Sequence, residues 1–128
     1  MLGTRRVGNV TLDLFCGDIT EFACDAMVNA ANSSLSGGAG VDGAIHRVGG
    51  PTILQECREI GHCPTGKAVV TNSGELPCEY IIHAVGPIWK GGNDDEAKLL
   101  RQTYQNIIRS ATGLDIRHLA IPSISTGA

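Results

Sequence analysis

A glycine-rich turn between an apolar strand and a helix constrains the fold of this chain more than any other feature. The segment 26–30 is short and mostly apolar, and polar turns flank it, which is typical of a buried parallel strand. A loop with glycines at 37, 38, 40 and 43 follows, and residues 41–48, opened by Asp42, read as a helix. Because such a turn points backbone N–H groups and a helix dipole at one place, the segment predicts an anion-binding loop in an α/β fold.

Length and charge narrow the class of protein. At 128 residues we expect one domain with one core, and 42% hydrophobic with 18% charged residues is typical of an ordered chain. The net charge of −3 argues against a nucleic-acid surface, which needs clustered Lys and Arg. The charge of an anionic ligand would therefore be met by backbone N–H groups rather than by ammonium groups.

The cysteines and the N-terminus predict a cytoplasmic protein. The first eight residues lack the apolar centre of a signal peptide, and no apolar run approaches the ~18 residues of a membrane span. Five cysteines, an odd number without a CxxC pair, favour reduced thiols over a disulfide framework. Cys57, His62 and Cys63 could be zinc ligands, but no fourth partner follows at finger-like spacing. We therefore predict no metal and no cofactor.

Strands alternate with helices along the rest of the chain, and this order predicts a layered α/β fold. Ligands of such sheets bind outside the carboxyl ends of the strands, where Asp18 and the loops 29–40 and 123–127 fall. Helix 51–60 is bounded by Pro51 in its first turn and by Gly61 after its end. The remaining expected elements are strands at 10–16, 67–71, 80–85 and 118–121 and a helix at 94–111.

Two nucleotide-binding motifs match only in part. Residues 38–43 satisfy GxGxxG, but several polar or small residues separate them from the strand, and the following strand ends without the ribose-binding acid. Residues 61–68 resemble a P-loop until Ala68, which has no hydroxyl for Mg²⁺, and Lys67 begins a strand where a P-loop begins a helix. Neither a Rossmann domain nor an NTPase is favoured.

Six segments together resemble the macro domain family over nearly the whole chain. Within the family the chain is most similar to bacterial O-acetyl-ADP-ribose deacetylases and to MacroD-type hydrolases of mono-ADP-ribosylated proteins, and residues 88–92 strengthen the bacterial comparison. The resemblance implies a three-layer α/β/α fold with a central mixed, mostly parallel sheet. The six segments are residues 17–20, 28–32, 37–47, 63–66, 82–87 and 122–127.

The same resemblance implies a role for each site residue. Asp18 and Ile19 would bind adenine, two loops would hold the diphosphate, and Asn29, Asn32 and Asp42 would surround the distal ribose as the catalytic group. Simpler roles stay open, since Asp18 could cap the next short helix, Asn29 could pin a loop, and Asp42 could be an N-cap. The implied ligand-binding residues are Asp18, Ile19, Gly37, Gly38, Ala39, Gly40, Val41, Ser123, Ile124, Ser125, Thr126 and Gly127.

Asp42 is expected to orient a reacting group and to act only as a weak base. The dipole of its helix would stabilise the carboxylate by about 0.3–1 kcal/mol, so we expect an ionised group that orients water or a ribose hydroxyl. His46 lies one turn later, but no serine or cysteine nucleophile is spaced to partner it. We therefore expect structural roles for His46 and for His83, which lies on an apolar strand.

The function implied is a metal-independent, ADP-ribose-binding hydrolase that cleaves esters on the distal ribose. Its substrate would be O-acetyl-ADP-ribose or ADP-ribose on acidic side chains of proteins, with no nucleic-acid or membrane partner. The alternatives are a non-catalytic ADP-ribose reader and a regulatory partner of another protein. Because the family continues past the loop 123–127 with a further helix and a strand inside the sheet, we expect residues 1–128 to be a C-terminally truncated macro domain.

Overall fold

A mixed four-stranded sheet forms the centre of the molecule. The computed structural model describes residues 2–126, and the strands lie in the order β4 (Ala68–Asn72), β5 (Tyr80–Ala84), β3 (Ala26–Ala30) and β6 (Leu119–Ala120). Strand β3 pairs in parallel with both β5 and β6, whereas β4 pairs antiparallel with β5. The predicted mixed, mostly parallel sheet is confirmed.

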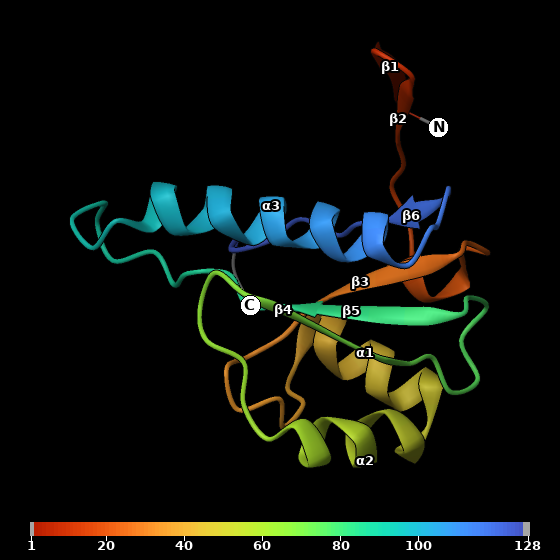
Figure 1. Cartoon of the computed structure of the whole chain (residues 1–128), viewed down its shortest axis with the longest axis vertical. Coiled ribbons are helices and arrows are strands. Elements are labelled where there is room, and N and C mark those ends of the chain that lie inside the picture. Colours follow the sequence, from red (N-terminus) through yellow and green to blue (C-terminus); the bar gives the residue numbers. More distant parts are fainter. Residues whose placement is uncertain (1, 127–128) are drawn as a thin grey trace.

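Helices cover both faces of this sheet and make three layers. Helices α1 (Gly40–Gly49) and α2 (Pro51–Ile60) lie on one face and α3 (Glu96–Gly113) lies on the other (Figure 1). The predicted bounds of α2 are confirmed: Pro51 occupies its first turn, and Gly61, at φ +89°, ends it in a conformation that suits glycine. The expected α/β/α architecture is therefore present.

The sheet divides the core in two because its central strands, β3 and β5, are buried on both faces. Met27 and Ile81 pack beneath α1 and α2, whereas Val28 and Ile82 pack beneath α3. Successive side chains of a strand point to opposite faces. The odd-numbered residues of β3 and β5 therefore face α1 and α2, and this alternation turns polar side chains at the ends of these strands toward the same layer.

The N-terminal strands depart from the prediction. We expected one strand at residues 10–16 in the layered sheet. The structure instead pairs β2 (Val10–Leu14) with β1 (Gly3–Val7) in a separate antiparallel hairpin that projects from the body (Figure 1). Every residue of β2 is exposed, and Gly8 takes the positive φ of +60° in the two-residue turn. The Gly8-Asn9 pair between two alternating runs is the sequence signal from which this hairpin could have been predicted.

All five cysteines are free thiols in the structure. Cys57 and Cys63 are buried, whereas Cys16 is exposed. Burial raises the pKa of the Cys57 thiol to about 11 and that of Cys78 to about 12. Cys57, which is buried, and Cys78, which is partly buried, are therefore neutral thiols near pH 7 and behave as small apolar side chains. No helix in residues 2–126 combines the length and the apolar character that crossing a membrane requires.

Candidate functional site

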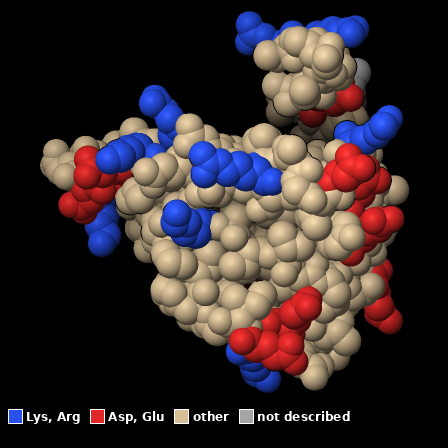
Figure 2. Space-filling view, viewed as in Figure 1, with Lys and Arg blue, Asp and Glu red and all other residues tan. Residues whose placement is uncertain are grey.

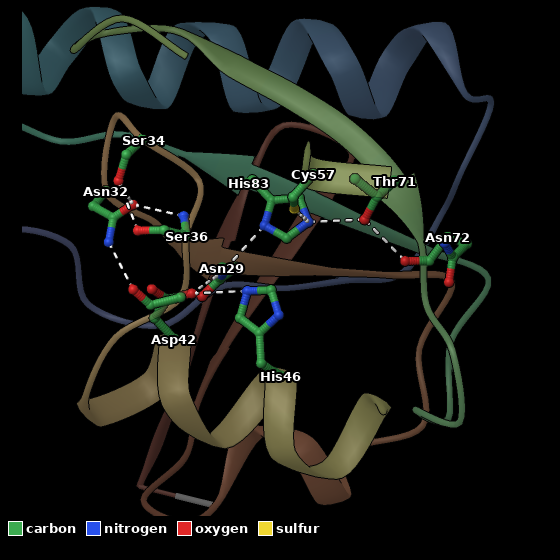
Figure 3. Close-up of polar contacts among 11 residues, drawn as sticks. Asn29, Asn32, Ser34, Ser36, Asp42, His46, Cys57, Thr71, Asn72 and His83 are labelled. Atoms are coloured by element: carbon green, nitrogen blue, oxygen red, sulfur yellow. Dashed lines mark hydrogen bonds and ion pairs between the residues drawn. The ribbon is translucent and has the colours of Figure 1, made fainter. Parts of the chain in front are cut away.

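Asn29 links strand β3 to helix α1 at the carboxyl end of the sheet. Its side chain is completely buried, and its Nδ2 atom donates to Asp42 Oδ1 at 2.8 Å and contacts His83 Nδ1 at 3.0 Å (Figure 3). Asp42 itself is only 6% exposed. In the structure the Asn29 side chain makes internal hydrogen bonds. They connect strand β3 to helix α1 and do not fix a loop.

Asp42 is not the N-cap of α1, so that alternative was wrong. The cap position is Ala39, which makes no side-chain cap hydrogen bond, and Asp42 lies within the first turn of the helix. Its Oδ1 lies 3.3 Å from His46 Nε2 one turn later. Its Oδ2 faces Gly38, where an added Cβ would lie 3.2 Å away. One carboxylate oxygen is thus held inside the protein, and the other lies against the glycine loop.

Asn32 lies on the other side of Gly38 and shapes the same loop. Its Nδ2 donates to the carbonyl oxygen of Gly37 at 2.8 Å, and its Oδ1 accepts from Ser34 Oγ at 2.9 Å and from the Ser36 N–H at 3.2 Å. A Cβ at Gly38 would lie 3.8 Å from Asn32 Nδ2. Asn32 and Asp42 therefore flank one glycine, although Asn32 is exposed.

The glycine loop packs tightly against the start of α1. A Cβ at Gly43 would come within 3.0 Å of the carbonyl oxygen of Gly38, so only glycine lets the helix approach so closely. The first backbone hydrogen bond of this turn runs from Gly43 N to Ala39 O. The N–H groups of residues 40–42 precede it, and the first N–H groups of a helix have no partner within the helix. The glycine loop and the start of α1 therefore have the features expected of an anion-binding site.

The second predicted loop lies next to the end of β5. Ile124 anchors it by burial, and Ser125 takes the left-handed backbone conformation, with φ +62°. A Cβ at Gly86 would overlap Ser125 Oγ and Ile124 Cγ2, so this glycine permits the close approach. Ser123 Oγ and Thr126 Oγ1 lie within hydrogen-bond distance of each other, at 3.0 Å. Gly127, which is also predicted as a site residue, lies outside the described residues.

A cavity of about 650 Å³ opens beside the end of β3 and the segment that follows β5. Asn32 and Gly86 line it, together with Lys90 and the buried carboxylate of Glu96. Glu96 accepts the N–H groups of Lys90 at 2.9 Å, Gly92 at 2.8 Å and Asp94 at 2.6 Å, and these bonds lower the pKa of its carboxyl. Glu96 thus fixes the loop 90–94 that forms one wall. No sequence signal marks Glu96 as a site residue, because it reads as an ordinary helical glutamate.

Asp18 caps a short 3-10 helix, η1 (Ile19–Glu21), which confirms its simpler role. Its Oδ1 accepts from the Thr20 hydroxyl at 2.7 Å and from the Thr20 N–H at 3.0 Å, and these bonds lower the pKa of the Asp18 carboxyl. Both bonds use Oδ1, so Oδ2 accepts neither of them. The adenine contacts implied for Asp18 and Ile19 stay predictions.

The side chains that could share a metal differ from the Cys57, His62 and Cys63 trio that the sequence argues against. Among residues 2–126, His46, Cys57 and His83 place possible ligand atoms within 4.8 Å of one another, whereas His62 is exposed and outside this group. Both ring nitrogens of His83 are already engaged, Nδ1 with Asn29 and Nε2 with Thr71 Oγ1 at 2.8 Å. Hydrogen bonds alone therefore account for the burial of His83.

On the face drawn in Figure 2, the basic side chains of the described residues lie in separate groups, and acidic groups lie beside some of them. That face carries no continuous basic surface. That an anion at the glycine loop would be bound mainly by backbone N–H groups stays a prediction from the charge balance.

Comparison with known proteins identifies relatives of this chain. The family model described as Macro domain matches residues 28–128. The chain is 54% identical over 121 residues to the "Macro domain-containing protein RSc0334" of Ralstonia nicotianae, covering 94% of this chain and 71% of that protein. It is 50% identical over 116 residues to a Citrobacter koseri protein named O-acetyl-ADP-ribose deacetylase, covering 88% of this chain and 66% of that protein.

Solved structures agree with these sequence matches. The Oceanobacillus iheyensis macrodomain with ADP superposes with a TM-score of 0.92 at 39% identity, over 98% of this chain and 70% of that one. The Trypanosoma brucei macrodomain in complex with ADP-ribose superposes with a TM-score of 0.81 at 40% identity, over 87% of this chain and 46% of that one.

Proposed function

Because this chain belongs to the macro domain family, we propose that it binds ADP-ribose and hydrolyses esters on the distal ribose. The relatives support the ligand class, since the Trypanosoma brucei macrodomain was solved with ADP-ribose and the Citrobacter koseri relative is named a deacetylase of its O-acetyl ester. The family and fold that the sequence motifs predicted are confirmed.

The observation that carries the proposal is the position of Asp42. One carboxylate oxygen is held by Asn29 and lies near His46, while the other lies against Gly38 in the anion-binding loop. A diphosphate bound at the N–H groups of this loop would bring the adjoining ribose next to Oδ2. A fixed carboxylate there can accept a proton from a water molecule that attacks the acyl carbon of the ester, so that the acyl–oxygen bond breaks and the ribose oxygen leaves as a hydroxyl after taking up a proton. The same carboxylate can orient a neighbouring ribose hydroxyl by accepting its hydrogen bond.

The supporting roles follow from the same geometry. Asn32 would keep the loop in shape, because both polar atoms of its amide bond within residues 32–37. The cavity beside Asn32 would accept the acyl group, and its size leaves room for more than an acetyl group. We therefore propose two substrate types, O-acetyl-ADP-ribose and ADP-ribose joined to acidic side chains.

The test pairs binding with turnover. Calorimetry with ADP-ribose and product analysis on both esters are run on the wild-type chain, on Asp42→Ala and on Glu59→Ala, which removes an exposed acid on α2. We expect Asp42→Ala to bind ADP-ribose within a few fold of wild type and to lose turnover by about 100-fold or more. We expect Glu59→Ala to behave as wild type.

Two outcomes would contradict the proposal. Full turnover by Asp42→Ala with unchanged binding would remove the carboxylate from the mechanism. Binding of ADP-ribose by the wild-type chain without any product from either ester would assign the chain to the non-catalytic readers instead.

A further inference from the structure

A row of polar side chains crosses the sheet beneath α1 and α2. Asn29 on β3, Thr71 on β4 and His83 on β5 are each 3% exposed or less, and Asn29 and His83 are register partners across the parallel pair. Their neighbours on this face include Met27 and Ile81 of the apolar core. Since burying polar groups is costly unless they are hydrogen-bonded, the bonds that join this row determine how it is arranged.

The hydrogen bonds have one consistent direction. Asn29 Nδ2 contacts Asp42 Oδ1 and His83 Nδ1, and a carboxylate oxygen can only accept. Both amide hydrogens of Asn29 are therefore used, and His83 Nδ1 is an unprotonated acceptor. The His83 proton then lies on Nε2 and is donated to Thr71 Oγ1, whose own hydroxyl donates to the carbonyl oxygen of Asn72 at 2.9 Å.

The surroundings of His83 keep it in this neutral form. Burial, followed by the charge of the neighbouring His46, lowers the pKa of His83 to about 4. The His46 and His83 rings stack with their centroids 6.1 Å apart. A second proton on His83 would turn Nδ1 from an acceptor into a donor aimed at the Asn29 amide.

We propose that His83 is a positioning residue for Asp42 and acts through Asn29 (Figure 3). By accepting one amide hydrogen, His83 fixes the plane of the Asn29 amide and aims the other hydrogen at the carboxylate. The inference rests on the proposed function, because it takes Asp42 as the group that acts on the substrate.

The other end of the Asn29 amide cannot supply this orientation. Asn29 Oδ1 is buried and has no hydrogen-bond partner among the described residues. The Asn29 amide is thus held in place by the two hydrogen bonds of its Nδ2 atom, to Asp42 and to His83. Without the acceptor at His83, the amide could rotate and turn its oxygen toward Asp42, where two acceptors would repel each other.

Two substitutions at His83 distinguish a role in positioning the Asn29 amide from a role in packing the core. In His83→Asn the new amide oxygen can take the place of Nδ1 and accept from Asn29. In His83→Gln the longer side chain carries its amide to the Nε2 side instead. Cys57→Ala is the matched control, because its sulfur lies 3.7 Å from His83 Nε2 but outside the row of bonds to Asp42. Thermal melts establish that each variant is folded.

We expect His83→Gln to lose about tenfold in kcat on the ester substrate with KM within about twofold, and His83→Asn to recover most of the loss. Cys57→Ala should melt at a lower temperature and keep wild-type kcat. Wild-type kcat in His83→Gln, equal losses in both His83 variants, or the same loss in Cys57→Ala would each overturn the inference.

A spectroscopic measurement tests the hydrogen bonds without relying on turnover. In the wild-type protein labelled with ¹⁵N-histidine, long-range ¹H–¹⁵N spectra should show His83 as the neutral Nε2–H tautomer at pH 7. An Nδ1–H tautomer or a protonated ring would overturn the inference even in an active enzyme. The expected tautomer in a wild-type chain that hydrolyses neither ester would refute the proposed function instead and leave the bonding of His83 intact.

Discussion

Replacing Gly43 by alanine tests whether the close approach of α1 to the glycine loop is essential. At an unobstructed helical position, glycine to alanine stabilises a protein by about 1 kcal/mol. At Gly43, however, the new Cβ would lie within 3.0 Å of the Gly38 carbonyl oxygen and 3.4 Å from its carbonyl carbon. Because the obstacle is backbone, no side-chain rotation relieves it, and overpacking of this kind costs about 3 kcal/mol at its upper end. We expect a net loss of about 2 kcal/mol in the free energy of unfolding.

The assay is urea denaturation followed by circular dichroism, with ADP-ribose affinity measured by calorimetry on the same samples. Gly113→Ala is the matched control, since Gly113 is also helical and an added Cβ there meets nothing within 4 Å. Gly113→Ala should be as stable as wild type or more so, and it should bind ADP-ribose normally. Gly43→Ala should be less stable and bind at least about tenfold more weakly, because the displaced loop carries the N–H groups that we propose bind the diphosphate. If Gly43→Ala matched Gly113→Ala in both measurements, the steric argument would be refuted.

Three further predictions concern other parts of the molecule. Glu96→Gln should lower the thermal midpoint at pH 7. The difference from wild type should shrink as the pH falls below the ordinary glutamate pKa of 4.5, because the pKa of Glu96 is lowered in the fold and its carboxylate stabilises the fold only while it is charged. An undiminished difference at low pH would contradict this. With a thiol reagent in native buffer, Cys16 should react first and buried Cys57 only after urea is added, so equal native rates would disprove the burial of Cys57. Asp25→Asn should speed hydrogen exchange at the His118 amide, which Asp25 accepts at 2.9 Å, and unchanged exchange would show that this bond does not protect it.

Helix bounds were the most predictable part of the fold. Pro51 and Gly61 delimit α2 by local backbone chemistry, and both bounds were correct. The expected long helix at 94–111 is observed as α3 at Glu96–Gly113, because Asp95 rather than a residue before it takes the cap position. Strand pairing was less predictable. The alternation in residues 10–14 indicates a strand but not its partner, so the hairpin with β1 was missed.

The gathering of Asn29, Asn32 and Asp42 was predictable in outline, since loops at the carboxyl ends of parallel strands meet at one edge. The link to His83 was not, because it depends on the register in which β5 lies beside β3, and no local pattern encodes that register. The roles of these residues toward a ligand stay predictions.

The two-sided burial of β3 limits how this protein can vary. Val28 belongs to the layer under α3, whereas Met27 and Asn29 belong to the layer under α1. Removing or adding one residue before Asn29 would exchange the two sets, so an amide would enter the α3 core and a valine would face Asp42. A change of two residues would keep every side chain in its own layer. Unless a bulge accommodates the difference, β3 can gain or lose residues only in even numbers. An even change is therefore as strict a requirement for the site as the identity of Asn29.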